Sequence, residues 1–212
     1  YTGAIAVGIA ALTSLRGLGH TMAASVDLQA QTLLGADIEV ESNLPFSAKT
    51  AAILDSIGGE QSVQVEFNSM VLLPRVGGAR LAQVRAHEGG YPYYGQLQTV
   101  PAEAADTWQS SGGALVDEAM LLQFDATIGD SIRVGEANFI ISGRLLNVPG
   151  ETSLRSDVQP RVFIPLRFLA ATGLVKRGSR VEYRRYFRRP DGEDVAKLAQ
   201  RMRHQLEDEN VD

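Results

Sequence analysis

The chain has 212 residues, of which 44% are hydrophobic and 21% are charged, so it is long enough and apolar enough to form a folded core. Its formal net charge of -5 gives no general attraction to phosphate backbones, and we expect no nucleic-acid partner. Because the chain contains no cysteine, a disulfide framework, a thiolate metal site and a cysteine nucleophile are all excluded.

The first segment, residues 1–15, is apolar and carries no charge. It is shorter than the roughly 20 residues that a membrane-spanning helix requires, and it lacks the basic start of a signal peptide. We interpret residues 1–15 as the remnant of a first transmembrane helix. The alternative is an ordinary buried helix.

An amphipathic helix is predicted to continue this segment after Arg16, since apolar residues recur there at three-to-four spacing. Its apolar stripe is a candidate stalk or protomer interface and consists of Leu18, Met22, Val26 and Leu33. Gly35 predicts a left-handed end of this helix, and residues 37–42 then alternate between apolar and acidic positions as a strand does.

The next part of the chain predicts a helix followed by a hairpin. The helix is expected over residues 47–57 and ends before two glycines. Two strands, 63–74 and 80–87, follow it, and residues 75–78 between them have the composition of a hairpin turn. Residues 89–101 show no regular pattern.

The middle of the chain predicts a smaller, β-rich unit. It begins with a short helix over residues 102–109 and continues with a strand and a helical turn over residues 114–124. Short alternating strands separated by glycines follow between residues 125 and 146, which is typical of a small meander or half-barrel.

Mixed structure returns after a polar loop over residues 148–160. The elements expected there are a strand at 161–164, a helix at 166–172, a strand at 180–187 and a final helix at 191–208. The predicted fold class is therefore α+β, in which a split mixed α/β domain holds a small β-rich inserted lobe.

Five segments match one known family in sequence and in order: QTLLGADIEVES, YPYYGQL, GGALVDEAMLLQFDATIGDSIRVGEANFIISG, QPRVFIPLRFLAATGL and GSRVEYRRYF. On these segments the chain resembles the MacB-like periplasmic core domain of FtsX-like ABC transporter permeases, and it is most similar to the YbbP type. The resemblance covers nearly the whole chain. It implies that residues 16–100 and 158–212 form a porter-like domain and that residues 101–157 form its inserted lobe.

The resemblance also implies a location and a set of partners. Such a domain lies on the extracytoplasmic, periplasmic side of the inner membrane, between the first two transmembrane helices of a permease. Its expected partners are a cytoplasmic ATP-binding subunit, reached through the transmembrane part, a second permease protomer and a periplasmic protein. The domain itself is expected to be non-catalytic and to couple ATP hydrolysis to transport or mechanotransmission of a hydrophobic, lipid-like substrate or partner. The alternative is a free-standing solute- or lipid-binding module.

No catalytic residue, cofactor or metal is expected, because the P-loop, GxSxG and HExxH motifs are all missing from the sequence. The three histidines, His20, His87 and His204, lie on separate predicted elements, so they would have to converge by folding to bind a metal. His87 and Glu88 precede two glycines, which leaves open a hydrolase with an unrecognised site or, as the plainer interpretation, a hinge.

Two groups of residues are candidate binding surfaces. The first group is aromatic and consists of Tyr91, Tyr93 and Tyr94. These tyrosines would either bind a partner or substrate or pack between the two lobes. The second is basic and consists of Arg180, Arg184, Arg185, Arg188 and Arg189. These arginines would either attract anionic headgroups or an acidic partner, or protect a solvated edge strand.

Overall fold

The computed structural model describes residues 35–149, 159–176, 178–189 and 195–206. The predicted transmembrane remnant and the apolar stripe of Leu18, Met22, Val26 and Leu33 lie outside these ranges. Within them, no helix has the length and apolar character needed to cross a bilayer.

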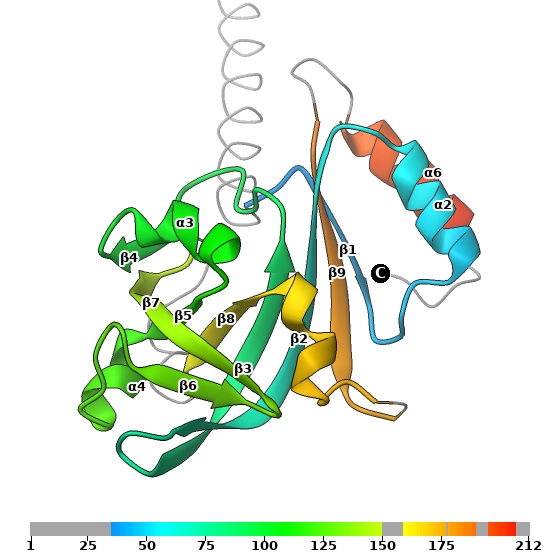
Figure 1. Cartoon of the computed structure of the whole chain (residues 1–212). Helices are drawn as coiled ribbons and strands as arrows, with labels where there is room; N and C mark the ends of the chain where they lie inside the picture. The colour runs from blue at the N-terminus through cyan, green and yellow to red at the C-terminus, as the bar shows by residue number, and fades with distance from the viewer. Residues whose placement is uncertain (1–34, 150–158, 177, 190–194, 207–212) are drawn as a thin grey trace, which may run out of the picture.

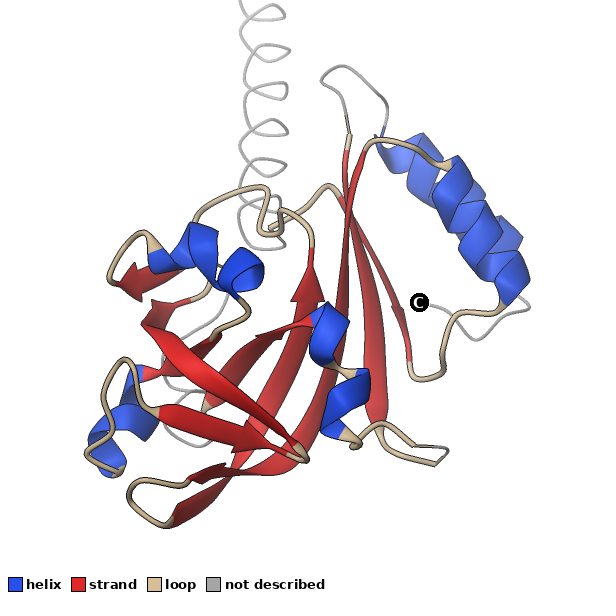
Figure 2. Cartoon of the chain, in the orientation of Figure 1, coloured by secondary structure: helices blue, strands red, loops and turns tan. Residues whose placement is uncertain are grey.

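The described residues form nine strands in one mixed sheet, with helices around it (Figures 1 and 2). The strands are β1 Ile38–Ser42, β2 Glu60–Leu73, β3 Gly78–Glu88, β4 Gln98–Val100, β5 Ala114–Asp117, β6 Ser131–Val134, β7 Ala137–Asn147, β8 Arg161–Pro165 and β9 Val181–Arg188. The helices are α2 Ala48–Ser56, α3 Ala104–Ser111, α4 Glu118–Gln123 and α6 Val195–Leu206, with 3₁₀ helices η1 Leu166–Phe168 and η2 Ala170–Thr172. The prediction of an α+β fold is confirmed.

Six of the described strands close into a ring, because each pairs with the next in the order β2, β3, β8, β5, β7 and β6, and β6 pairs again with β2. Apolar side chains fill the ring, among them Val71, Val84, Val116, Ile132 and Ile164. A ring of this size has room for side chains alone. Its strands come from both the predicted split domain and the predicted inserted lobe, and the division between these two stays a prediction.

The strands outside the ring form a second layer with two helices. Strand β9 pairs antiparallel with both β1 and β2, so β1 and β2 run parallel on either side of it, and α2 connects them as a split βαβ unit. Helices α2 and α6 lie together over one face of these strands (Figure 1), where Leu54, Phe187 and Met202 form the core. Ser47 begins α2 by accepting a hydrogen bond from Thr50 N.

The structure corrects three predictions about elements in part. The strand expected at 180–187 is present as β9, but it is not the edge strand that one interpretation of its arginines required, because it pairs with β1 on one side and β2 on the other. Residues 166–172 form two 3₁₀ helices, since Leu169 N and Thr172 N bond to carbonyls three residues back. Residues 89–101 include β4, whose pairing with β7 leaves no local pattern in the sequence.

Candidate functional site

Gly35 is tied to the loop of residues 89–97. Tyr93 N and Tyr94 N both donate to the carbonyl of Gly35, at 2.7 and 3.3 Å. Gly35 has a φ of +69°, and a Cβ there would lie 3.0 Å from Cε2 of Tyr91. A side chain at this position would therefore be strained and would also press on the loop.

Asp37 joins three parts of the fold. Its carboxylate accepts hydrogen bonds from the hydroxyl of Tyr94 at 2.8 Å and from the backbone N–H of Arg189 at 2.7 Å. Its own N–H donates to the carbonyl of Phe187 at 3.0 Å. We call Gly35–Asp37 with these partners the entry junction. It links residues 35–37 to loop 89–97 and to the end of β9.

The three predicted aromatic residues are half-buried, and each makes a contact within the fold. Tyr91 stacks on Tyr186 with ring centroids 3.8 Å apart. The hydroxyl of Tyr93 lies 2.7 Å from Oγ of Ser62, and that of Tyr94 binds the entry junction. These contacts hold loop 89–97 against the sheet, and the use of the tyrosines as a binding surface stays a prediction.

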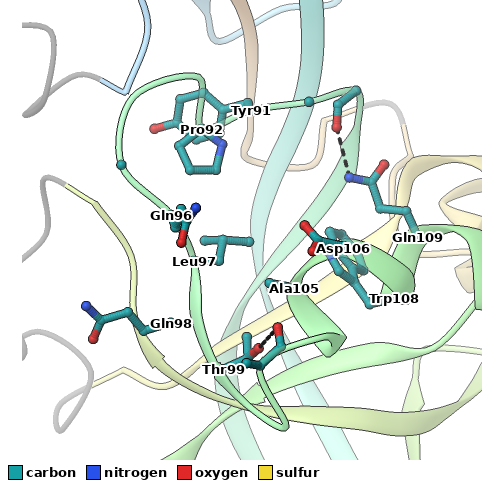
Figure 3. A pocket seen from close by; sticks show the side chains of 14 residues that line it. Tyr91, Pro92, Gln96, Leu97, Gln98, Thr99, Ala105, Asp106, Trp108 and Gln109 are labelled. Carbon is teal, nitrogen blue, oxygen red and sulfur yellow. Dashed lines mark hydrogen bonds between the residues drawn. The ribbon is translucent and has the colours of Figure 1, made fainter.

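A cleft of about 960 Å³ lies between loop 89–97 with β4 on one side and α3 on the other (Figure 3). Gln109 of α3 joins the two walls, because its Nε2 donates to the carbonyl of Gly89 at 2.9 Å. The polar residues that line the cleft are Gln96, Gln98, Thr99, Asp106 and Gln109. Tyr91 is the only one of the three predicted tyrosines in the described lining.

His87 lies buried beside this cleft, with 2% of its surface exposed. Its ring stacks on Trp108 at 6.4 Å between centroids and is tilted against Tyr91 at 5.7 Å. Burial lowers the pKa of His87 to about 4, while the nearby backbone of Gly89 acts in the opposite direction. The imidazole is therefore neutral near pH 7.

The structure does not bring His87 and Glu88 together as a catalytic pair. As neighbours on β3 they point to opposite faces, and Glu88 is exposed while His87 is buried. His20 lies outside the described residues and His204 lies on α6. Among the described residues, no group of three or more His, Asp or Glu side chains is arranged to hold a metal.

The buried histidine predicts that stability depends on pH. Between about pH 4 and the ordinary pKa of 6.5, His87 is protonated in the unfolded chain and neutral in the folded protein. The fold should therefore lose on the order of 3 kcal/mol as the pH falls through this window, with no further loss from this group below it. Urea unfolding of the wild type and of His87→Gln, measured from pH 7 to pH 4, tests this. Equal slopes for the two proteins would contradict it.

The predicted basic cluster is largely paired with acidic residues of the fold. Arg184 contacts Glu182 at 2.8 Å and Glu41 at 3.2 Å, and it approaches Glu39 at 3.5 Å. Burial raises the pKa of Glu39, and the charge of Arg184 lowers it again. Arg184 is thus surrounded by carboxylates on the outer face of β1 and β9.

Three other arginines of the cluster also have partners, whereas Arg180 is exposed at the margin of a smaller, 360 Å³ cavity. Arg185 binds Asp55 at 2.5 Å, Arg188 lies 3.7 Å from a carboxylate oxygen of Glu60, and Arg189 donates to the backbone carbonyl of Ile57, just after α2. A headgroup or acidic-partner surface here stays a prediction, and much of its positive charge is balanced within the fold.

One family model matches nearly the whole chain. A family model described as the MacB-like periplasmic core domain matches residues 1–205. The uncharacterized ABC transporter permease YbbP of Escherichia coli (strain K12) is 25% identical over 184 residues, which are 87% of this chain and 22% of that protein. The chain thus spans less than a quarter of the length of this curated relative.

Two solved structures are similar to the fold. A domain of a permease protein from Porphyromonas gingivalis matches with a TM-score of 0.51 and 13% identity, over 84% of this chain and 87% of that chain. The periplasmic region of MacB from Actinobacillus actinomycetemcomitans matches with a TM-score of 0.50 and 13% identity, over 87% and 92%. At these identities the likeness concerns the fold alone.

Proposed function

This chain belongs to the MacB-like periplasmic core domains, and we propose that it transmits movement from the membrane part of an ABC transporter permease to a partner or substrate in the periplasm. The sequence resemblance described above is confirmed by the family match over residues 1–205. In this proposal the domain has no catalytic role. The permease lies in the inner membrane, and a separate cytoplasmic subunit binds and hydrolyses ATP.

The observation that carries the proposal is the entry junction. Asp37 binds both Tyr94 of loop 89–97 and the backbone of Arg189 at the end of β9. A displacement of the chain before Gly35 would therefore pull on two segments that are distant in sequence. One of them, loop 89–97, forms a wall of the cleft, so movement of a stalk helix would change the shape of the cleft.

The proposal also includes the partners that the resemblance implies. The predicted stripe of Leu18, Met22, Val26 and Leu33 would pack as a stalk or against a second permease protomer. The periplasmic target is either a hydrophobic, lipid-like substrate or a protein partner. A free-standing binding module is the second candidate, and the cleft is the observation that favours it.

Removing the Asp37 carboxylate should weaken the link between movement of the chain before Gly35 and the shape of the cleft. In a permease that carries this domain, assembled with its ATP-binding subunit in lipid nanodiscs, spin labels at Gln96 and Thr107 would report the width of the cleft. We expect the wild type to change this distance on ATP binding. Asp37→Ala should weaken the coupling between ATP binding and the width of the cleft by about 0.5–2 kcal/mol while ATP hydrolysis continues.

Two variants control for general damage to the fold. Asp37→Asn keeps one oxygen that can accept from Arg189 N, and its amide nitrogen can donate to the hydroxyl of Tyr94 instead, so it should retain most of the response. Asp55→Ala removes an exposed carboxylate that pairs with Arg185 on the α2 side, and it should respond as the wild type does. If a folded Asp37→Ala protein shows the full ATP-dependent change, the entry junction does not transmit the movement.

A further inference from the structure

We propose that the cleft beside α3 binds an extended peptide segment of a periplasmic partner, which adds as a strand to the outer edge of β4. The inference rests on the proposed function in taking the partner to be periplasmic, and it deepens that function by naming the chemistry of the partner. It concerns binding alone and needs no movement of the domain.

The first support is the position of β4 at the end of the sheet. In the described residues β4 pairs with β7 on one side only. Gln98 and Thr99 of β4 also line the cleft, so this edge borders the cavity. An edge strand offers backbone N–H and C=O groups at the spacing that an added strand requires.

The second support is the chemistry of the lining. Three amide side chains, Gln96, Gln98 and Gln109, each supply hydrogen-bond donors and acceptors. Asp106 is the only charged side chain in the described lining, which contains no lysine or arginine. Anionic headgroups would meet a negative charge here, and an acyl chain would remove water from the amides without replacing their hydrogen bonds. The N–H and C=O groups of a peptide backbone can form hydrogen bonds with these amide side chains.

The third support is that loop 89–97, which forms one wall of the cleft together with β4, is held in place before any ligand binds. Gly89 has a φ of +103°, and a Cβ there would lie 2.5 Å from Oγ of Ser62. Tyr91 N donates to the same Ser62 hydroxyl at 2.9 Å, and Tyr91 stacks on Tyr186. A fixed wall reduces the entropy that binding would otherwise cost. Leu97 and Pro92 add apolar surface for alternate side chains of the ligand.

The test uses a phage-displayed library of random linear peptides selected against the 212-residue chain. Trp108 is the only tryptophan and lines the cleft, so its fluorescence reports binding there. Ala105 lines the cleft from the surface of α3, and Ala105→Arg should fill it and weaken the selected peptides about tenfold or more. Thr107→Arg is the matched control, because Thr107 is exposed on the same helix outside the described lining, and it should leave the affinity unchanged.

A second measurement separates strand addition from other modes of binding. Methylation of alternate backbone nitrogens of a selected peptide should abolish binding, and methylation of the intervening nitrogens should not, because strand hydrogen bonds have a period of two. The proposal is overturned if no peptide is enriched, if Ala105→Arg binds the peptides normally, or if both methylation patterns act alike. It is also overturned if monomeric lysophosphatidylcholine displaces the peptides and loses its own binding in Ala105→Arg. None of these outcomes bears on the Asp37 experiment.

Discussion

Replacing Asp117 by alanine is expected to lower the free energy of unfolding by about 3–5 kcal/mol, because it leaves the guanidinium of a buried ion pair without its charge partner. Asp117 and Arg161 are 1% and 5% exposed. Asp117 accepts from Nη2 of Arg161 at 2.8 Å, from its Nε at 3.0 Å and from its backbone N–H at 2.6 Å. These bonds join β5 to β8, which are paired neighbours in the ring.

Urea unfolding at pH 7, followed by circular dichroism, measures this loss. Glu60→Ala is the control, because Glu60 lies 3.7 Å from Arg188 in an ion pair whose side chains are 66% and 50% exposed, and it should cost less than about 1 kcal/mol. The double variant Asp117→Leu with Arg161→Met should recover part of the stability, since it leaves no buried charge unpaired. A loss at Asp117 no larger than at Glu60 would contradict the assignment of this pair as buried and structural.

Replacing Trp108 by alanine should cost about 3–5 kcal/mol, because the large side chain leaves a cavity that the surrounding helix and strands cannot close. Trp108 is 1% exposed and packs edge-to-face on Phe163 with ring centroids 6.0 Å apart. It belongs to the buried cluster between α3 and the ring that also contains Leu115 and Leu145. Loss of this contact should also open the cleft wall formed by α3.

The same variant should change the behaviour of His87. Trp108 covers the imidazole, so its removal should admit water and return the pKa of His87 toward the ordinary value. Thermal unfolding gives the stability, and NMR titration of the His87 ring gives the pKa. Trp108→Phe is the control, because it keeps an aromatic ring in place and should retain most of the stability and of the pKa shift. A Trp108→Ala protein with an unchanged His87 titration would show that other groups bury this histidine.

Much of the secondary structure was predictable because its signals are local. The hairpin of β2 and β3 follows from alternating strands around a glycine turn, and Gly77 indeed has a positive φ of +68°. The helix α2 follows from its Ser47 cap, and the end of η2 from Gly173, which has a φ of +66°. Each signal lies within a few residues of the element that it predicts.

The candidate site was predictable only in part. The tyrosines and the basic residues of β9 were found because their residue types stand out from their surroundings. The cleft was missed, since Gln98, Asp106 and Gln109 are ordinary surface residues until folding places β4 beside α3. The Asp117–Arg161 pair was also missed, although a charged residue within a short apolar strand, as in ALVD, is the kind of signal that could have indicated it.

The sequence by itself determined the order of the elements, the α+β class and the family, because the hydrophobic periodicity, the turn residues and the order of the motifs are all local features of the sequence. Only the tertiary structure decided that the strands close into a ring, since pairs such as Val71 with Val134 and Leu115 with Phe163 join residues that are far apart in sequence. It also decided that β9 lies inside the sheet with its arginines facing carboxylates. Strand register determines which residues face one another across neighbouring strands, and register depends on the packing of the whole core.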